Sequence, residues 1–339
     1  MNYNEVLDAA RPQMGPYCKT CPVCNGKACK NTMPGPGSKG SGTVFARNYD
    51  KWQEILLNMD TICDNKPADT SCRFFGQPMT IPVFIAPIGA MKLHYGDKYN
   101  DEEYNDIAIA GAAEAGIVAL TGDGVDANVM KSAVKAIEKN NGQAIPTIKP
   151  WNMELVEDKM NMVKDVNPVA IAMDIDAAGL PFLKNLQPPA GSKNVQELKQ
   201  IAAWAKKPFI LKGIMTVAGA MKALEAGASA IVVSNHGGRV LDSCPATAEV
   251  LPAIKAAVGD RMTILVDGGI RSGMDVFKAL ALGADGVLIG RPFVNMIYGA
   301  GKEGIKIYVE KLKAELEDTM SMCGAHSIEE INSSMIYNK

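Results

Sequence analysis

The sequence predicts an α/β fold, a closed barrel of eight parallel strands preceded by an N-terminal cap segment. From Ile81 onward, short apolar runs alternate with longer amphipathic stretches. Apolar strands separated by helices are typical of a parallel sheet, and eight such units close into a (β/α)8 TIM barrel. The alternative, a doubly wound sheet, usually has a Gly-x-Gly-x-x-Gly turn after its first strand, and none follows Ala86-Pro87.

Each repeating unit can be placed on the chain from its hydrophobic pattern. The expected strands are Pro82–Pro87, Ile117–Gly122, Ala144–Lys149, Ala170–Asp176, Phe209–Ile214, Ala230–Asn235, Thr263–Asp267 and Gly286–Gly290. The expected helices are Asn105–Ala115, Asn128–Lys139, Met153–Val166, Val195–Ala205, Val217–Ala226, Ala246–Val258, Met274–Leu282 and Lys302–Ser321. We therefore assign residues 81–339 to the barrel and residues 1–80 to the cap.

The cap contains two expected helices, Tyr3–Ala10 and Tyr49–Asn58, in an otherwise irregular lead-in. Residues 34–42 are rich in Gly, Pro and Ser, which predicts a flexible loop or linker between the cysteine-containing segment and the barrel.

Four of the eight cysteines crowd into the cap with the spacing Cys18-x-x-Cys21-x-x-Cys24-x4-Cys29. Four thiolates in one turn-rich loop can enclose zinc or an iron–sulfur cluster, so we expect these residues to bind one metal centre. The last spacing is one residue longer than in the ferredoxin-type run, and the choice of metal stays open. The alternative is a metal-free loop of reduced thiols, with or without a reversible disulfide.

The overall composition excludes several classes of partner. The chain has 339 residues, 47% hydrophobic and 21% charged, with a net charge of -2 and a pI near 6.0. Such a balance provides no basic field for nucleic acid or for an anionic membrane surface. The start of the chain has no basic and apolar leader, and no apolar run is long enough to span a bilayer. We expect a cytoplasmic protein that acts on a small molecule.

Chemically active side chains should gather where the strands end, because active sites of such barrels lie at the carboxyl ends of their strands. His236 follows the sixth strand and suits proton transfer at neutral pH. Arg239, three positions later, offers a planar fork for a carboxylate or phosphate. A merely structural polar loop is the alternative for this pair alone.

The loops after the seventh and eighth strands predict a phosphate site. They carry Asp267-Gly268-Gly269-Ile270-Arg271 and Gly290-Arg291-Pro292. Barrels frequently bind phosphate there through backbone N–H groups and a helix N-terminus. Two arginines and three glycines in that place indicate a phosphorylated ligand, unless they are only turn glycines and surface arginines.

These motifs together resemble the family of FMN-dependent 2-hydroxy-acid oxidases and dehydrogenases, which includes glycolate oxidase, lactate oxidase and flavocytochrome-type lactate dehydrogenase. The resemblance rests on the run from Ser234 to Arg239, Leu241-Asp242, Pro245-Ala246-Thr247, and the two glycine-arginine loops. It is dense from Pro208 to the C-terminus and recognisable from Ile85 onward. It implies FMN as cofactor and a homo-oligomer, a tetramer in this family.

The resemblance also assigns roles to residues. It makes His236 the base, Arg239 the carboxylate clamp, Asp176 the acid that orients the histidine, and Lys212 the cation beside the flavin N1 and O2. It assigns further cofactor contacts to Pro87, Ile88, Gly89, Ala90, Thr121, Ser234, Asp267, Gly269, Arg271, Gly290 and Arg291. The implied reaction is oxidation of a small L-2-hydroxy acid, lactate- or glycolate-like, to the 2-oxo acid by hydride transfer.

The sequence departs from the family around the substrate. No arginine follows Asp176 before the fifth strand, and two tyrosines that commonly line the family's pocket have no clear counterparts. Lys149 is a candidate for the lost contact, although a point charge does not reproduce a bidentate arginine. Two other functions therefore stay open: a non-redox flavin isomerase related to type 2 isopentenyl diphosphate isomerase, and a flavin-binding redox sensor without turnover.

Overall fold

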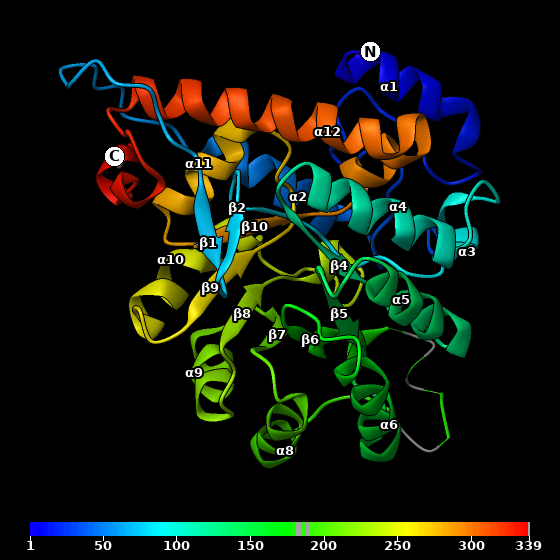
Figure 1. Ribbon diagram of the computed structural model, residues 1–339. Coiled ribbons are helices and arrows are strands. Elements are labelled where there is room, and N and C mark those ends of the chain that lie inside the picture. Colours follow the sequence, from blue (N-terminus) through cyan, green and yellow to red (C-terminus); the bar gives the residue numbers. More distant parts are fainter. Residues whose placement is uncertain (181–182, 184, 188–189, 338–339) are drawn as a thin grey trace.

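Eight parallel strands form a closed barrel in the computed structural model, which describes residues 1–180, 183, 185–187 and 190–337. Each strand pairs with its neighbour in sequence, and the last, β10, pairs with the first, β3 (Figure 1). The barrel strands are β3 (Val83–Ile85), β4 (Val118–Thr121), β5 (Ala144–Ile148), β6 (Ile171–Asp174), β7 (Phe209–Ile214), β8 (Ala230–Val233), β9 (Thr263–Val266) and β10 (Gly286–Ile289).

The composition of these strands explains their place in the fold. Val, Ile, Leu and Ala dominate, and β8, for example, is buried at all of its positions, Ala230–Val233. Side chains on one face of such a strand fill the barrel interior, and those on the other face pack against helices. The prediction of a (β/α)8 barrel is therefore confirmed.

Helices surround the barrel and follow the strands in sequence. They are α3 (Met91–Tyr95), α4 (Asp101–Glu114), α5 (Ala127–Lys139), α6 (Met153–Lys164), α8 (Val195–Ala205), α9 (Val217–Glu225), α10 (Thr247–Val258), α11 (Gly273–Ala281) and α12 (Arg291–Met322). At the start of α4, the side chains of Asn100 and Glu103 each accept a hydrogen bond from the other residue's backbone N–H. Asn194 and Glu197 cap α8 in the same way. In the part of the chain that the structure describes, no helix has the length and apolar character to cross a membrane.

Several expected elements have different limits in the structure, and three of these differences affect the site or the cap. The fourth barrel strand ends at Asp174 rather than Asp176, because the chain turns into a short 3-10 helix over Ile175–Gly179. The last helix begins at Arg291, well before Lys302, and is kinked at Ala300 and Gly301. The expected cap helix Tyr49–Asn58 is wrong in its limits, since α2 spans Thr43–Glu54.

The sequence pattern also missed a small hairpin in the cap. Strands β1 (Cys72–Phe74) and β2 (Gln77–Met79) pair antiparallel just before the barrel begins. The hairpin packs Phe74 edge-on against Phe84 of β3, with ring centroids 4.7 Å apart. Strands of three residues are too short for a readable alternation of apolar and polar side chains.

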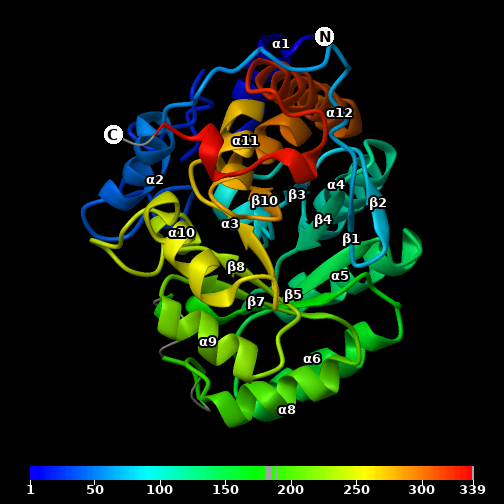
Figure 2. The ribbon, with the colours of Figure 1, turned by 90° about the vertical axis from the view of Figure 1, so that its left-hand side faces the viewer.

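The N-terminal helix packs on the long C-terminal helix. Helix α1 (Tyr3–Ala10), confirmed at its predicted limits, lies beside the first part of α12 (Figure 1). The rings of Tyr3 and Tyr308 are 5.3 Å apart at their centroids. A Cβ on Gly299 would lie 2.2 Å from the carbonyl oxygen of Val6, so this contact requires glycine. Helix α2 lies against α10 and α11 (Figure 2).

The Gly- and Pro-rich segment 34–42 is held against the barrel, so the prediction of a flexible separating linker is wrong. The Lys39 backbone N–H donates to the carbonyl of Gly238, 2.8 Å away. The Lys39 ammonium donates to the carbonyls of Gly179 and Val240, and the Ser41 hydroxyl donates to Asp242. These bonds fix the segment over the loops after β6 and β8. We call residues 33–37, which pass over the barrel mouth, the strap.

Candidate active site

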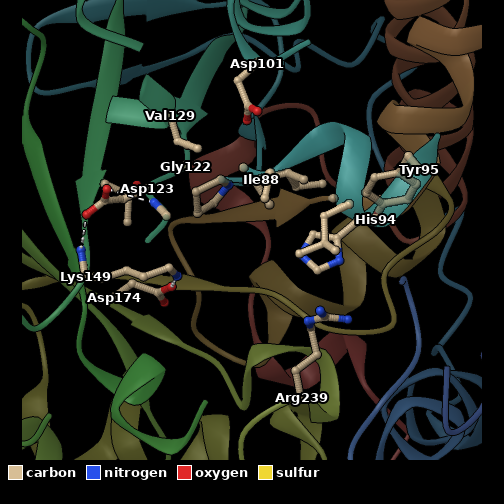
Figure 3. Close-up of a pocket in the computed structure, with 18 of the residues that line it drawn as sticks. Ile88, His94, Tyr95, Asp101, Gly122, Asp123, Val129, Lys149, Asp174 and Arg239 are labelled. Carbon is tan, nitrogen blue, oxygen red and sulfur yellow. Dashed lines mark hydrogen bonds and ion pairs between the residues drawn. The ribbon is translucent and has the colours of Figure 1, made fainter. Parts of the chain in front are cut away.

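A cavity of about 1090 Å³ opens at the carboxyl ends of the barrel strands (Figure 3). Every barrel strand or the loop after it contributes to its lining, as expected for an active site of this fold. The strap also contributes, through Gly35. The lining includes Pro87, Ile88, Gly89, Ala90, His94, Asp123, Lys149, Asp174, Lys212, His236, Arg239, Asp267, Gly269, Arg271, Gly290 and Arg291.

A buried carboxylate, Asp174 at the end of β6, organises the cations of the cavity floor. Its Oδ1 accepts a hydrogen bond from the Lys212 ammonium at 3.1 Å, and its Oδ2 lies 3.5 Å from the Lys149 ammonium. Although burial opposes ionisation, interaction with His236 and the positive charges of Lys212 and Lys149 hold the pKa of Asp174 well below its ordinary value. Conversely, burial favours neutral Lys212, but Asp174, Asp176 and Asp267 raise the pKa of Lys212. Both groups are therefore charged.

His236 has the surroundings of a general base. Its backbone adopts φ of 56°, a left-handed conformation unusual outside glycine, and its N–H donates to the Ser234 hydroxyl at 3.0 Å. Its Nδ1 lies 2.9 Å from Asp176 Oδ1 and 3.4 Å from Asp174 Oδ1. Burial lowers the pKa of His236 to about 3, although Asp174 opposes this shift. The imidazole is therefore neutral at pH 7.

Asp176 sits behind the imidazole rather than in the cavity. Burial raises the pKa of Asp176 well above its ordinary value, Lys212 opposes this shift and the charge of Asp174 adds to it. Asp176 Oδ1 lies 2.9 Å from His236 Nδ1, so an ionised Asp176 can accept the Nδ1 proton. When that proton lies on Nδ1, the lone pair of Nε2 is free to accept another one. The imidazolium formed in this way would be stabilised by Asp174 and Asp176 together.

Backbone carbonyls of the strap orient Arg239. One terminal nitrogen of its guanidinium donates to the carbonyls of Gly35 and Gly37, the latter at 2.9 Å. This arrangement leaves Nε and the other terminal nitrogen to bind a carboxylate side by side. Burial, with the nearby charge of Arg291, lowers the pKa of Arg239 to about 10, so the guanidinium stays charged at neutral pH.

The two arginines of the predicted phosphate site also hold the N-terminal segment. Arg291 donates from Nε to the carbonyl of Pro36 at 2.7 Å and stacks over the Phe45 ring at 3.7 Å. Arg271 donates from Nε to the carbonyl of Cys24, also at 2.7 Å. Both arginines line the cavity as well. This end of the cavity is therefore built jointly by barrel loops and cap.

The lining fits a ligand such as FMN. Three polar atoms of lining residues, Asp101 Oδ1, Thr147 Oγ1 and Asp267 Oδ1, are buried without a hydrogen-bond partner among the described residues. Buried polar groups are nearly always paired, so these atoms indicate a polar ligand. A ribityl chain has hydroxyls for such contacts, and Lys212, Arg271 and Arg291 suit an electron-rich ring and a phosphate. The volume accommodates FMN together with a small acid.

The structure brings together most of the site residues expected from the sequence. The residues from Pro87 to Ala90, together with Lys149, Lys212, Asp267, Gly269, Arg271, Gly290 and Arg291, line the cavity with His236 and Arg239. Thr121, Ser234 and Asp176 are not among the lining residues in the described part of the chain. Ser234 and Asp176 contact His236 instead, at its backbone N–H and at Nδ1 respectively.

Three residues of this region were missed in their roles. Asp174 lies only two positions from Asp176, and a strand end gives no signal as to which carboxylate faces inward. Asp123 is buried and accepts hydrogen bonds from the Lys149 backbone N–H, the Trp151 indole N–H and the Lys159 ammonium, which fixes the loop after β5. His94 lines the cavity from the short helix α3, and the sequence analysis gave no signal for it.

The four cap cysteines are free thiols close to this site. Burial raises the pKa of the Cys18 thiol to about 11, and the charge of Cys24 contributes there and at Cys21 and Cys29. Among the described residues, no three of these sulfur atoms lie within 4.8 Å of one another; only Asp174, Asp176 and His236 satisfy that criterion. The thiols interact electrostatically, but they do not form a closed tetrahedral set.

Comparison with protein families gives one match over most of the chain. The model of the FMN-dependent dehydrogenase family matches residues 36–185 and 181–338. Among characterised proteins, a 2-hydroxyacid oxidase of Dictyostelium discoideum is 30% identical over 323 residues, covering 87% of this chain and 83% of its own. An L-lactate oxidase of Lacticaseibacillus rhamnosus is 30% identical over 327 residues, covering 87% and 86%.

Solved structures with the same fold agree with these matches. A mandelate oxidase variant superposes with a TM-score of 0.80 at 26% identity, covering 98% of each chain. The flavin-binding domain of baker's yeast flavocytochrome b2 superposes with a TM-score of 0.78 at 23% identity, covering 89% of this chain and 80% of that one. At that lower identity, the second likeness concerns the fold alone.

Proposed function

Because the chain belongs to the FMN-dependent dehydrogenase family, we propose that it oxidises a small L-2-hydroxy acid, lactate- or glycolate-like, to the 2-oxo acid with FMN as hydride acceptor. The chain is thus an oxidoreductase acting on CH–OH donors. One observation carries the choice of substrate: a neutral imidazole, backed by Asp176, and an oriented guanidinium line the same cavity.

The residues of the chain divide the work as follows. Arg239 binds the carboxylate through Nε and the terminal nitrogen that does not bond to the strap, and thereby places the substrate hydroxyl near His236 Nε2. His236 takes the hydroxyl proton, and Asp176 and Asp174 stabilise the resulting charge. A bound FMN would supply the hydride-accepting chemistry that no side chain of the chain can provide. Lys212 supplies a fixed positive charge at the cavity floor, and Lys149 offers a second cation to the substrate.

Anaerobic mixing of the holoenzyme with L-lactate, glycolate and L-mandelate tests the reaction. Loss of the oxidised flavin absorbance with formation of the 2-oxo acid is the expected result. Product formation without net flavin reduction would support the isomerase instead, and binding without either change would support the sensor.

A His236→Ala variant tests the assigned base. We expect the rate of flavin reduction to fall by about 10²- to 10⁴-fold, the usual contribution of a general base, while FMN stays bound. His326→Ala is the matched control, because His326 is not among the lining residues in the described ranges. Unimpaired flavin reduction in the His236 variant would refute the mechanism.

For the cap, we propose that Cys18, Cys21, Cys24 and Cys29 bind one metal centre, either zinc or an iron–sulfur cluster. The cysteine spacing and the electrostatic interaction of the thiols support the proposal. Tetrahedral zinc, with Zn–S bonds of about 2.3 Å, needs sulfur atoms ~3.8 Å apart, so zinc loading requires the thiols to converge. Thiolates of a cluster attach to different irons and can stay farther apart.

Elemental analysis of anaerobically purified protein distinguishes these centres. About one zinc per chain supports the structural ion, whereas iron with matching sulfide supports the cluster. Replacing Cys18 and Cys21 by serine should abolish the metal content, and replacing the exposed Cys63 should not change it. Metal retained by the double variant would exclude these four residues as the site.

We further propose that the protein is a homo-oligomer of four copies, as the resemblance to the family implies. It rests on the resemblance alone. Light scattering of the holoenzyme in solution measures the mass directly, and a monomer at micromolar concentration would refute it.

A further inference from the structure

A second histidine, His94, lines the cavity, and the proposed reaction gives it no role. It comes from α3 (Met91–Tyr95), which follows the loop after β3. Figure 3 shows its imidazole facing the guanidinium of Arg239 across the cavity, with Tyr95 on the side away from the cavity centre. The histidine is therefore on the carboxylate side of the site.

The strap determines which ring nitrogen of His94 carries the proton. The Gly35 backbone N–H donates to Nδ1 at a distance of 3.0 Å, so Nδ1 is an acceptor. In a neutral imidazole the proton must then lie on Nε2, which becomes a donor. Within the described residues, no protein group accepts a hydrogen bond from Nε2, and this atom is not sealed from the cavity.

The surroundings of His94 keep it neutral. Burial lowers the pKa of His94 to about 3, and the positive charges of Arg239 and Lys149 contribute to the shift. An additional cation at this point would repel Arg239. A neutral N–H donor can share an anionic ligand with the guanidinium without that repulsion.

We propose that His94 binds the substrate carboxylate through Nε2–H, beside Arg239. The inference rests on the proposed function, because it concerns the same hydroxy acid. A carboxylate has about four lone-pair positions, so it can accept the fork of Arg239 and one further donor together. His94 thereby supplies a contact for which the sequence offers neither a second arginine nor a tyrosine. The strap, through Gly35, keeps this donor pointed at the substrate.

Two substitutions separate substrate binding from a structural role. In His94→Asn, the amide oxygen can still accept from the Gly35 N–H, but the distal donor is lost. In His94→Gln, the distal amide N–H replaces Nε2–H, but the contact with Gly35 is lost. Removing one hydrogen bond to a charged group should raise KM for L-lactate in the Asn variant by about tenfold or more, with kcat and FMN content little changed. The Gln variant should stay within about threefold of wild type.

Binding of pyruvate to the oxidised holoenzyme, followed by the flavin absorbance, provides a second readout that needs no turnover. The dissociation constant should rise with the Asn variant and not with the Gln variant. His326→Asn is the matched control and should change neither quantity.

Equal losses of pyruvate affinity in both His94 variants would show that His94 only anchors the strap. Wild-type affinity in the Asn variant would show that His94 does not bind the carboxylate. Either result overturns the inference. If wild type binds pyruvate in a His94-dependent way but no hydroxy acid reduces the flavin, the proposed function fails and the inference stands.

Discussion

The strand ends and the strap hold the same cavity in different ways. The strands present side chains, such as Asp174 and Lys212, whose chemistry is evident from residue type. The strap presents the carbonyls of Gly35 and Gly37 to Arg239, and the carbonyl of Pro36 to Arg291. Every residue has a carbonyl, so what matters in the strap is the path of the backbone. Substitutions in the two regions should therefore damage different properties.

The largest effect is expected at the strand ends, for Asp174→Asn. Loss of this carboxylate removes the 3.1 Å partner of the buried Lys212 and leaves Asp267, 3.6 Å away, as its remaining ion pair in the described structure. Breaking a buried ion pair typically costs about 3 to 5 kcal/mol, so the free energy of unfolding should fall by roughly 3 kcal/mol at pH 7. Chemical denaturation measures it, and the control Asp260→Asn, at a fully exposed position, should change little.

The difference in the free energy of unfolding between wild type and Asp174→Asn should depend on pH, because the pKa of Asp174 is lowered in the folded protein. The folded-state value lies below the value of about 3.9 in the unfolded chain, so the contribution of Asp174 is complete above about pH 4. It is lost as the pH falls through the folded-state pKa. The stabilities of wild type and Asp174→Asn should therefore converge below pH 4; a constant difference down to pH 3 would argue against an ionised Asp174.

Arg239→Lys tests the place where the two regions meet. A lysine ammonium cannot donate to the strap carbonyls and at the same time bind a carboxylate through two parallel hydrogen bonds. We expect kcat/KM to fall about 100-fold, or ~2.7 kcal/mol, mostly through KM. The control is Arg261→Lys, because Arg261 also donates to backbone carbonyls, those of Val258 and Ala257, but outside the cavity lining. A Lys variant with the wild-type KM would show that the guanidinium geometry is unimportant.

Gly37→Ala changes only the path of the strap. A Cβ there would lie 2.3 Å from the Cys29 carbonyl oxygen and 2.6 Å from the Thr32 backbone nitrogen, so the strap must shift. We expect KM for the hydroxy acid to rise about tenfold, since Arg239 and His94 lose their orientation, with FMN retained. In the control, Gly15→Ala, the Cβ meets nothing within 4 Å. Identical kinetics of the two variants would mean that the strap does not orient the site.

The smallest effect on catalysis is expected for Trp52, a cap side chain that lies away from the reacting groups. The Trp52 indole N–H donates to the Gly268 carbonyl at 2.8 Å, and that carbonyl retains a contact with the Thr247 hydroxyl at 3.4 Å. Trp52→Phe should lower the free energy of unfolding by about 1 kcal/mol for the lost hydrogen bond, with a further loss from the buried ring volume removed, and leave KM unchanged. Thermal unfolding together with steady-state kinetics checks both. A changed KM would extend the role of the cap beyond the strap.

The barrel and its chemical side chains could be predicted because their signals are local. Each strand is a short apolar run bounded by polar or glycine residues, and the rule that sites lie at strand ends then collects Lys212, His236 and Arg239. His94 could not be found in this way, since a helix of five residues has too few turns for a readable periodicity. Its proximity to Arg239 depends on how the loop after β3 folds back over the mouth.

The sequence by itself therefore determined the (β/α)8 barrel and, through its strand-end motifs, most of the residues that line the cavity. The apolar runs of the strands and the glycines of the loops after them can be read directly from the sequence. Only the tertiary structure decided that Asp174 organises the cations, that residues 33–37 form a strap instead of a free linker, and that Gly35 sets the proton position on His94. The physical reason is that these features depend on backbone atoms and on distances between segments far apart in sequence, which residue identity does not encode locally.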